Sequence, residues 1–341
     1  MAPRFEPKKI LIVLHGSIGD VTRALPMATL LRTGFPQAHL AWAVEPPSLP
    51  LVQNYPEVDE VILFDRRRWW ADFGPFLKRV RCGGFDLVLD LQRHFKSGFI
   101  SRWSGAPHRV GFNRRDGKEF NWLFNNHFIP AFGDGISKLD HYLKFAEYLG
   151  VGTNPVAWKF KLSADEETAV DRHLAGVKRS FAVLFVGSRW ESKQWFPAQV
   201  AGCGKLIDER NGLDVVLLGA KGEEHLAEQA ISRAEFSATN LVGLTSLREA
   251  LGIIMRARVA VGPDTGLMHI AAAVGTPVVS LWGATNPLRT GPYGFGDLVI
   301  QGRAACVPCY RSHCPIGRVC MQSISVEEIA GKITQALALA P

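Results

Sequence analysis

The chain has 341 residues, a mass of 37.6 kDa and a formal net charge of +7 at pH 7. Its length predicts two domains, and a hydrophobic content of 47% with 33 glycines is typical of a well-packed α/β protein. No apolar run reaches the ~18–20 residues that cross a bilayer. Residues 1–7 are polar and lead into a strand, so we expect no signal peptide and a cytoplasmic location.

Strands and helices alternate along the first half of the chain. An apolar strand at 9–14 precedes a short loop and a helix at 21–33, which ends before Gly34 and Pro36. Crossovers of this length between strands imply a parallel sheet. Further strands are expected at 40–44, 60–64 and 85–91, and further helices at 48–54, 70–82, 96–104 and 137–149.

Residues 151–165 show no clear periodicity, and we interpret them as a linker between two domains. The alternation then restarts, so the sequence predicts doubly wound domains at 1–165 and 166–325 and a closing helix at 326–341. Expected strands lie at 181–186, 215–218, 241–242, 259–261, 277–281 and 298–301, and expected helices at 197–211, 223–234, 246–256 and 326–339.

The stretch 261–283 is the most informative part of the sequence, because it predicts strand, tight loop, helix, tight loop and strand. Asp264 is a good N-cap, Thr265 and Gly266 open the first turn, and the helix ends at Gly275. Unpaired N–H groups and the positive end of the helix dipole make such a turn an anion site, most often for phosphate. The alternative is an empty turn of the kind common in α/β proteins.

Another glycine-rich loop, residues 16–20, follows the first strand. It lacks the G-x-G-x-x-G pattern, so the dinucleotide fingerprint is absent. Asp20 lies near the expected start of the next helix at the carboxyl end of a strand. It is interpreted either as a capping residue or as a general base in a ligand site.

Two loops of the second half also follow strands. In residues 187–197, we expect Ser188, Arg189 and Lys193 to contact an anion. Simple solvent exposure of Lys193 is disfavoured, because it lies between two aromatic residues at the carboxyl edge of a strand. In residues 219–224, a carboxylate of Glu223 or Glu224 is equally consistent with binding ribose hydroxyls and with complementing a helix dipole.

Positive charge is concentrated in the first half of the chain. Between residues 93 and 118 a single acid, Asp116, accompanies seven basic residues: Arg93, Lys96, Arg102, Arg109, Arg114, Arg115 and Lys118. Upstream, Arg66, Arg67 and Arg68 precede Trp69 and Trp70. The pattern predicts either a solvated basic face or a surface for polyanions, and the tryptophans favour an amphipathic, membrane-proximal surface.

Four of the six cysteines form the cluster Cys306, Cys309, Cys314 and Cys320. Four thiolates could hold zinc, but the later spacings are irregular for a zinc ribbon. Free or transiently oxidised thiols are the favoured interpretation, and Cys82 and Cys203 are expected to be ordinary residues of helices.

Several of these motifs together resemble glycosyltransferase family 9, the family of ADP-heptose:lipopolysaccharide heptosyltransferases. The resemblance extends from about Lys8 to about Ile333 and includes the cysteine-rich tail. The motifs are Gly16-Ser-Ile-Gly-Asp20, Leu25-Pro26, Lys193-Gln-Trp195, Asp264-Thr-Gly-Leu-Met-His269 and Leu281-Trp-Gly-Ala-Thr-Asn-Pro287.

The resemblance implies an α/β protein with the GT-B fold, in which two Rossmann-like domains face each other across a cleft. It implies that the first domain binds the acceptor and the second the nucleotide sugar. The implied reaction is an inverting, metal-independent transfer of heptose from ADP-heptose to the inner core of lipopolysaccharide, without a cofactor. An anionic glycolipid acceptor further implies peripheral association with the inner face of the inner membrane.

The resemblance also assigns residues to roles. Asp20 matches the catalytic base and Lys193 a phosphate-binding lysine with a catalytic role. The residues expected to bind the donor are Gly19, Ser188, Lys193, Glu223, Asp264, Thr265, Gly266 and His269. The residues expected to bind the acceptor are Arg66, Arg67, Arg68, Lys96, Arg114 and Lys118. No metal site is implied, and the four clustered cysteines are the only weak candidates.

One position departs from the family pattern. Lys221 stands where relatives have an acidic residue for the ribose, and Glu223 follows two positions later. The alternatives are therefore a family 9 enzyme with another nucleotide sugar or surface-glycan acceptor, and a non-enzymatic nucleotide or nucleic-acid binder. No RNA- or DNA-binding motif is present, so we expect no nucleic-acid partner.

Overall fold

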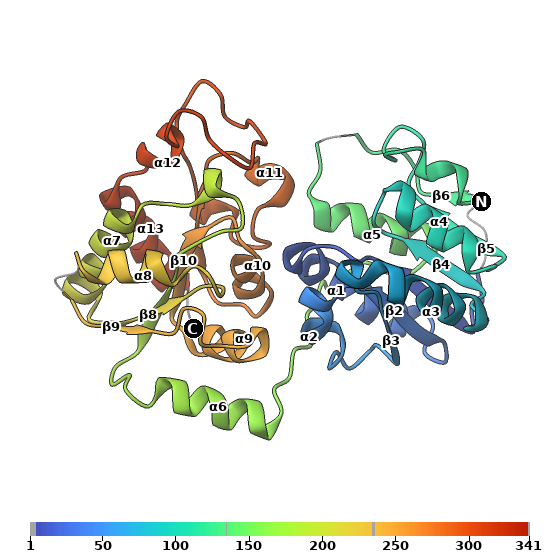
Figure 1. The fold of residues 1–341 in the computed structure, drawn as a ribbon, viewed down its shortest axis with the longest axis horizontal. Helices are drawn as coiled ribbons and strands as arrows, with labels where there is room; N and C mark the ends of the chain where they lie inside the picture. Colours follow the sequence, from blue (N-terminus) through green and yellow to red (C-terminus); the bar gives the residue numbers. More distant parts are fainter. Residues whose placement is uncertain (1–4, 134, 234–235, 340–341) are drawn as a thin grey trace. The chain divides into compact units, whose positions relative to one another are not determined.

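The structure, a computed structural model, describes residues 5–133, 135–233 and 236–339. The chain divides into two compact units, residues 1–161 and 162–341 (Figure 1). Each unit contains a six-stranded sheet in which all neighbouring strands are parallel. Within the described ranges, no helix has both the length and the apolar character needed to cross a membrane.

Unit 1 has the strand order β3-β2-β1-β4-β5-β6. Its strands are β1 (Lys9–Val13), β2 (His39–Val44), β3 (Glu60–Leu63), β4 (Leu87–Asp90), β5 (His108–Gly111) and β6 (His127–Phe128). Helix α1 (Ile18–Gly34) packs on α2 (Leu49–Val52) and α5 (Lys138–Tyr148), whereas α3 (Trp69–Cys82) packs on α4 (Phe95–Trp103). The apolar faces of α3 and α4 bury Phe76, Leu77, Val80 and Ile100 against β1, β2, β3 and β4.

Unit 2 repeats this arrangement with the order β12-β11-β10-β7-β8-β9. Its strands are β7 (Phe181–Phe185), β8 (Asp214–Leu218), β9 (Ala238–Asn240), β10 (Val259–Pro263), β11 (Val278–Trp282) and β12 (Val299–Gln301). Its helices are α6 (Ala164–Leu174), α7 (Pro197–Asn211), α8 (Glu224–Ile231), α9 (Leu247–Arg256), α10 (Gly266–Ala273), α11 (Pro287–Thr290), α12 (Val319–Gln322) and α13 (Val326–Leu339).

Most of the predicted elements are confirmed, and the exceptions have local causes. The strand expected at 241–242 lies at Ala238–Asn240, and the helix expected at 223–234 ends at Ile231, with residue 234 outside the described residues. The sequence did not predict β5, β6 or α6. Helix α6 buries only Val170 among its described residues, so it has no apolar stripe, although Ser163 and Glu166 form a capping box at its start.

In each unit the polar loops of interest follow parallel strands, so they share the carboxyl edge of the sheet. In unit 1 the loop with Asp20 follows β1, Arg66 follows β3 and Lys96 follows β4. In unit 2 Lys193 follows β7 and Asp264 follows β10. The fold therefore gathers one set of candidate residues at the carboxyl edge of each sheet.

Candidate active site

Asp20 lies in the first turn of α1, at the carboxyl edge of the unit 1 sheet. The helix begins at Ile18, with Ser17 as the N-cap that accepts a hydrogen bond from the Asp20 N–H at 3.3 Å. Asp20 therefore lies near the N-cap, as the sequence predicts, but the interpretation of Asp20 as the capping residue is wrong, because the helix begins at Ile18 and not at residue 21. The Asp20 Oδ1 accepts hydrogen bonds from Lys138 Nζ at 2.6 Å and from Arg23 Nη2 at 2.7 Å.

The two cations determine the charge state of Asp20. Burial acts to raise its pKa, but the ion pairs with Lys138 and Arg23 outweigh burial and hold the pKa of Asp20 well below its usual range. The side chain keeps 20% of its surface exposed. Asp20 is therefore ionised at pH 7, and solvent or a ligand can reach its carboxylate.

His15, in the loop before α1, feels the charges of Arg66 and Lys96, two residues expected to bind the acceptor. Burial, and then the charges of Arg66 and Lys96, lower the pKa of His15 to about 4, so the imidazole is neutral at pH 7. Gln92, which follows β4, accepts hydrogen bonds from the N–H groups of His15 at 2.7 Å and Gly16 at 3.1 Å. Arg66 and Lys96 thus bring positive potential to the loop that presents Asp20.

The other expected acceptor residues lie on segments that follow strands of the same sheet. Arg67 and Arg68 are exposed on the 3-10 turn η2 (Arg66–Arg68). Arg114 lies over the ring of Trp122, with 5.7 Å between its Cζ and the ring centroid. Lys118 is exposed, and its N–H donates to the Arg93 carbonyl. These residues contribute positive charge to unit 1 without a contact to Asp20 in the described part of the chain.

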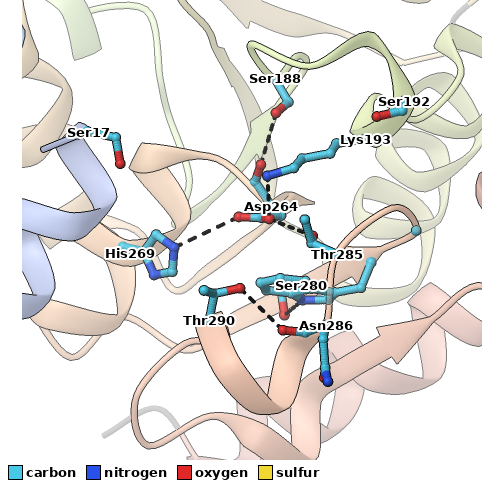
Figure 2. Close-up of polar contacts among 12 residues, drawn as sticks. Ser17, Ser188, Ser192, Lys193, Asp264, His269, Ser280, Thr285, Asn286 and Thr290 are labelled. Atoms are coloured by element: carbon cyan, nitrogen blue, oxygen red, sulfur yellow. Dashed lines mark hydrogen bonds and ion pairs between the residues drawn. The ribbon is translucent and has the colours of Figure 1, made fainter. Parts of the chain in front are cut away.

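In unit 2, Asp264 is the centre of a polar cluster at the end of β10 (Figure 2). Its Oδ2 accepts hydrogen bonds from Lys193 Nζ at 2.6 Å and Thr285 Oγ1 at 2.7 Å. His269 Nε2 lies 3.9 Å from its Oδ1, and Ser188 Oγ donates to its main-chain carbonyl at 2.9 Å. The prediction that Asp264 is the N-cap of α10 is wrong, because Thr265 takes that position. The Asp264 carboxylate contacts these side chains instead.

Lys193 occupies the last position of the 3-10 turn η4 (Glu191–Lys193), in the loop after β7. Its Nζ lies 4.5 Å from the centroid of the Trp190 ring, a cation–π contact. The side chain is 16% exposed, so a ligand can reach it. Lys193, Asp264 and the N-terminus of α10 thus form the candidate anion site, whereas Arg189, expected beside them, is exposed.

The cysteine-rich segment contacts the loop after β7 that carries Lys193. Glu191 accepts hydrogen bonds from the Cys314 N–H at 3.0 Å and forms an ion pair with Arg318 at 2.9 Å. Arg318 also donates to the Gln194 carbonyl at 3.0 Å, and its guanidinium lies over the Phe196 ring. Of the four clustered thiols, Cys306 is exposed and Cys320 is buried. Across the described ranges no three His, Cys, Asp or Glu side chains are arranged to hold a metal ion.

Glu223 lies between the loops that follow β7 and β8. Its Oε2 accepts a hydrogen bond from the Ala220 N–H at 2.8 Å, and burial raises its pKa. A Cβ on Gly187 would lie 2.4 Å from Glu223 Cδ, so a side chain at position 187 would displace this carboxylate from its present position. Glu224 instead accepts from the Gly222 N–H. The geometry therefore favours Glu223 over Glu224 as the candidate carboxylate for ribose hydroxyls.

The sequence pointed to most of the side chains in these clusters but missed three partners. Lys138 and Arg23 hold Asp20, and Thr285 holds Asp264. Thr285 belongs to a motif that the sequence singled out without giving it a role. Gly19, expected at the donor site, is buried in α1 of unit 1.

The comparisons with known proteins point to one family of enzymes. Residues 74–320 match the family model "Glycosyltransferase family 9 (heptosyltransferase)". The chain is 28% identical over 298 residues to the lipopolysaccharide core heptosyltransferase OpsX of Haemophilus influenzae, covering 86% of this chain and 84% of that one. It is 27% identical over 317 residues to lipopolysaccharide heptosyltransferase 1 of Pseudomonas aeruginosa, covering 90% and 87%.

Solved structures establish the fold. A family 9 glycosyltransferase from Veillonella parvula has a TM-score of 0.84 at 18% identity and covers 99% of both chains. The Escherichia coli heptosyltransferase WaaC, solved with ADP, has a TM-score of 0.75 at 21% identity and covers 97% of this chain and 99% of that one. With the family match, these likenesses lead to one conclusion: the chain belongs to glycosyltransferase family 9, and it is a glycosyltransferase with the GT-B fold.

Proposed function

We propose that this glycosyltransferase moves heptose from ADP-heptose to a sugar of the lipopolysaccharide inner core, with inversion at the anomeric carbon and without a metal ion. The names of its relatives support the substrates, since both curated proteins described above are lipopolysaccharide heptosyltransferases. The observation that carries the mechanism is the cluster in which Lys193 Nζ lies 2.6 Å from Asp264 at the start of α10.

The donor half of the proposal concerns the leaving group. As the bond between the anomeric carbon and the phosphate oxygen breaks, ADP departs with the electron pair and its diphosphate gains negative charge. Lys193 and the first N–H groups of α10, from Thr265 and Gly266 onward, supply positive potential there without a divalent ion. Asp264 would repel phosphate, so we assign its carboxylate to heptose hydroxyls and to the orientation of Lys193. His269 and Ser188 position Asp264.

The acceptor half concerns the incoming alcohol. Its oxygen attacks the anomeric carbon from the face opposite the diphosphate, which inverts the configuration, and its proton passes to the Asp20 carboxylate. Because Lys138 and Arg23 hold the pKa of Asp20 low, Asp20 is a weak base towards a free alcohol. We infer that it takes the proton late, when bond formation has made the oxygen acidic. Water must be excluded from the reacting groups while the transfer takes place.

The basic residues of unit 1 suit an anionic glycolipid acceptor. Arg66 and Lys96 act on His15 beside the Asp20 loop, and Arg67, Arg68, Arg114 and Lys118 extend the positive surface. Phosphate and carboxylate groups of an inner core would meet these side chains. Such an acceptor is anchored in a bilayer, so the proposal includes peripheral association of a cytoplasmic enzyme with the inner membrane.

The direct test measures transfer. Purified protein is incubated with ADP-heptose and an inner-core acceptor in the presence of EDTA, and ADP release and product mass are followed. The expected result is stoichiometric ADP release and addition of one heptose with inverted anomeric configuration. A parallel screen of ADP-, GDP- and UDP-sugars tests the donor, because Lys221 departs from the family pattern. Activity only with a GDP- or UDP-sugar would contradict ADP-heptose as the donor.

The proposal predicts that Gly187→Ala weakens ADP binding. The new methyl group would displace the Glu223 carboxylate from its present position, and we assign this carboxylate to the ribose hydroxyls. Loss of one hydrogen bond to a charged group costs about 1.5–3 kcal/mol, or a roughly 10- to 150-fold rise in the Kd for ADP by calorimetry. Gly176→Ala is the matched control, since a Cβ there meets open space. If both Gly187→Ala and Glu223→Gln bind ADP like the wild type, the ribose assignment is wrong.

The proposal also predicts a pH effect for Lys138→Met. Without Lys138, burial raises the pKa of Asp20 and only Arg23 opposes it. The ionised base is then lost at a higher pH, so the acid limb of kcat/KM moves upward from the wild-type position, which lies below pH ~4 for this group. The control is Lys144→Met on the same helix, where Lys144 pairs with Glu147 at 3.6 Å. An unchanged acid limb in Lys138→Met would contradict the assignment of Asp20 as base.

A further inference from the structure

Unit 1 has exposed aromatic and aliphatic side chains on neighbouring elements at one edge of its sheet. Helix α3 packs on η2 and α4, and α4 packs on the 3-10 turn η3 (Asn121–Leu123) (Figure 1). Five exposed apolar residues lie at the starts of α3 and α4, in η3 and just before it. We call them the aromatic face: Trp69, Trp70, Phe95, Phe120 and Leu123. Trp70 is 72% exposed and Leu123 70%. A soluble protein rarely leaves such a set uncovered.

A ring contact joins the two helices that carry Trp69, Trp70 and Phe95. Phe73 of α3 stacks on Phe99 of α4, with ring centroids 6.4 Å apart. Trp69 lies four residues before Phe73, and Phe95 lies four residues before Phe99, so each occupies the helical turn that precedes this contact. Since α3 follows β3 and α4 follows β4, and all strands of the sheet are parallel, their first turns share the carboxyl edge of the sheet.

The segment with η3 continues the same surface. The Phe95 ring contacts the Phe124 ring with centroids 5.0 Å apart, and the Phe95 N–H donates to Glu119 Oε2 at 3.2 Å. Phe120 and Leu123 therefore lie beside the start of α4. The aromatic face thus runs from η2 across the starts of α3 and α4 to η3.

Basic side chains border the aromatic face. Those that are exposed near the starts of these elements or on the segment before η3 include Arg66, Arg67, Arg68, Lys96, Arg114 and Lys118. Of the acids nearby, Glu119 pairs with His94 at 3.1 Å and Glu45 lies 3.7 Å from Arg66. Aromatic side chains between arginines and lysines match the interface of an anionic bilayer, where rings enter the headgroup region and cations meet lipid phosphates.

We propose that the aromatic face docks unit 1 on a bilayer of anionic phospholipid, and so holds the carboxyl edge with Asp20 at the membrane surface. The choice of a bilayer over a protein partner rests on the proposed function, because a lipid-anchored acceptor reaches Asp20 from a membrane. Docking requires only side-chain insertion, since the contact is made by the first turns of α3 and α4 and by η3. Arginine and lysine side chains of the border then lie where the anionic headgroups of acceptor and phospholipid meet.

The first test is vesicle flotation of the full chain. Wild-type protein is expected to float with vesicles of phosphatidylethanolamine and phosphatidylglycerol, to float less at high salt, and to remain unbound with phosphatidylcholine. The double variant Trp70→Ser, Leu123→Ser is expected to bind the anionic vesicles roughly 100-fold more weakly, from the loss of two large apolar side chains. Leu244→Ser in unit 2, where Leu244 is 65% exposed, is the matched control and should bind like the wild type.

The second test separates docking from catalysis. The double variant should transfer heptose to a soluble, acyl-free acceptor at the wild-type rate and lose transfer to acceptor embedded in the anionic vesicles. Flotation of the double variant like the wild type, or failure of wild-type protein to bind vesicles while it binds single-stranded RNA, would overturn the docking proposal. Absence of transfer to the soluble acceptor by wild-type protein would instead overturn the proposed function, whatever flotation shows.

Discussion

Replacement of Asp20 with asparagine is expected to lower kcat for heptose transfer by ~10²–10⁴-fold, the usual contribution of a general base. Asparagine keeps the shape of the side chain, and the main-chain hydrogen bond from residue 20 to Ser17 remains. An amide cannot accept the proton of the attacking alcohol. It also removes the negative charge that lies 2.6 Å from Lys138 and 2.7 Å from Arg23.

The measurement separates the loss of a base from a loss of structure. Asp20→Asn leaves two cations without their carboxylate, so we expect destabilisation of about 1–3 kcal/mol, measured by thermal or urea unfolding. ADP affinity should stay at the wild-type value, because the candidate anion site is built from unit 2 residues. Asp59→Asn is the control: Asp59 accepts hydrogen bonds from Arg32 and the Leu40 N–H in the same unit, but it precedes β3 at the opposite edge of the sheet. Wild-type kcat in Asp20→Asn would exclude Asp20 as the base.

Local patterns explain why much of the site could be predicted from the sequence. The strand end, the Gly-Pro pair and the helix start around Asp264 specify a turn with free N–H groups, and they do so within a few residues. Lys193 was identified in the same way, from its place after a buried strand. The alternation of apolar strands and amphipathic helices likewise predicted the two parallel sheets, because each periodicity is a property of one segment.

Two of the three partners that the sequence missed, Lys138 and Thr285, contact their carboxylates from distant positions in the chain, whereas Arg23 lies three residues from Asp20 on the same helix. Lys138 reaches Asp20 across 118 positions, and Thr285 reaches Asp264 across 21. No local pattern marks a lysine at the start of α5 as the partner of a residue in α1. The sequence predicted a base at position 20 but could not show that two cations hold its pKa low, since the pKa depends on the folded surroundings.

The second large effect is expected for Lys193→Met, which keeps much of the apolar stem and removes the charge. Loss of a preorganised cation at the departing diphosphate should lower kcat by ~10²–10³-fold. The Kd for ADP should rise roughly 10- to 150-fold, since ADP carries the same diphosphate. Lys205→Met is the matched control, because Lys205 lies in the same unit and pairs with Glu209 at 3.8 Å. It should change neither quantity.

Asp264→Asn shows whether Lys193 acts on a phosphate or only forms an ion pair that stabilises the loop. If Lys193 binds the diphosphate, the Asp264 carboxylate opposes that binding by repulsion, so Asp264→Asn should tighten ADP while it lowers transfer through lost contacts to heptose. If the pair is only structural, both single variants disturb the same loop, and ADP affinity should fall equally in Asp264→Asn and Lys193→Met. We expect ADP affinity to rise in Asp264→Asn and to fall in Lys193→Met. A bound diphosphate is repelled by the carboxylate and attracted by the ammonium group, so removal of the two charges has opposite effects.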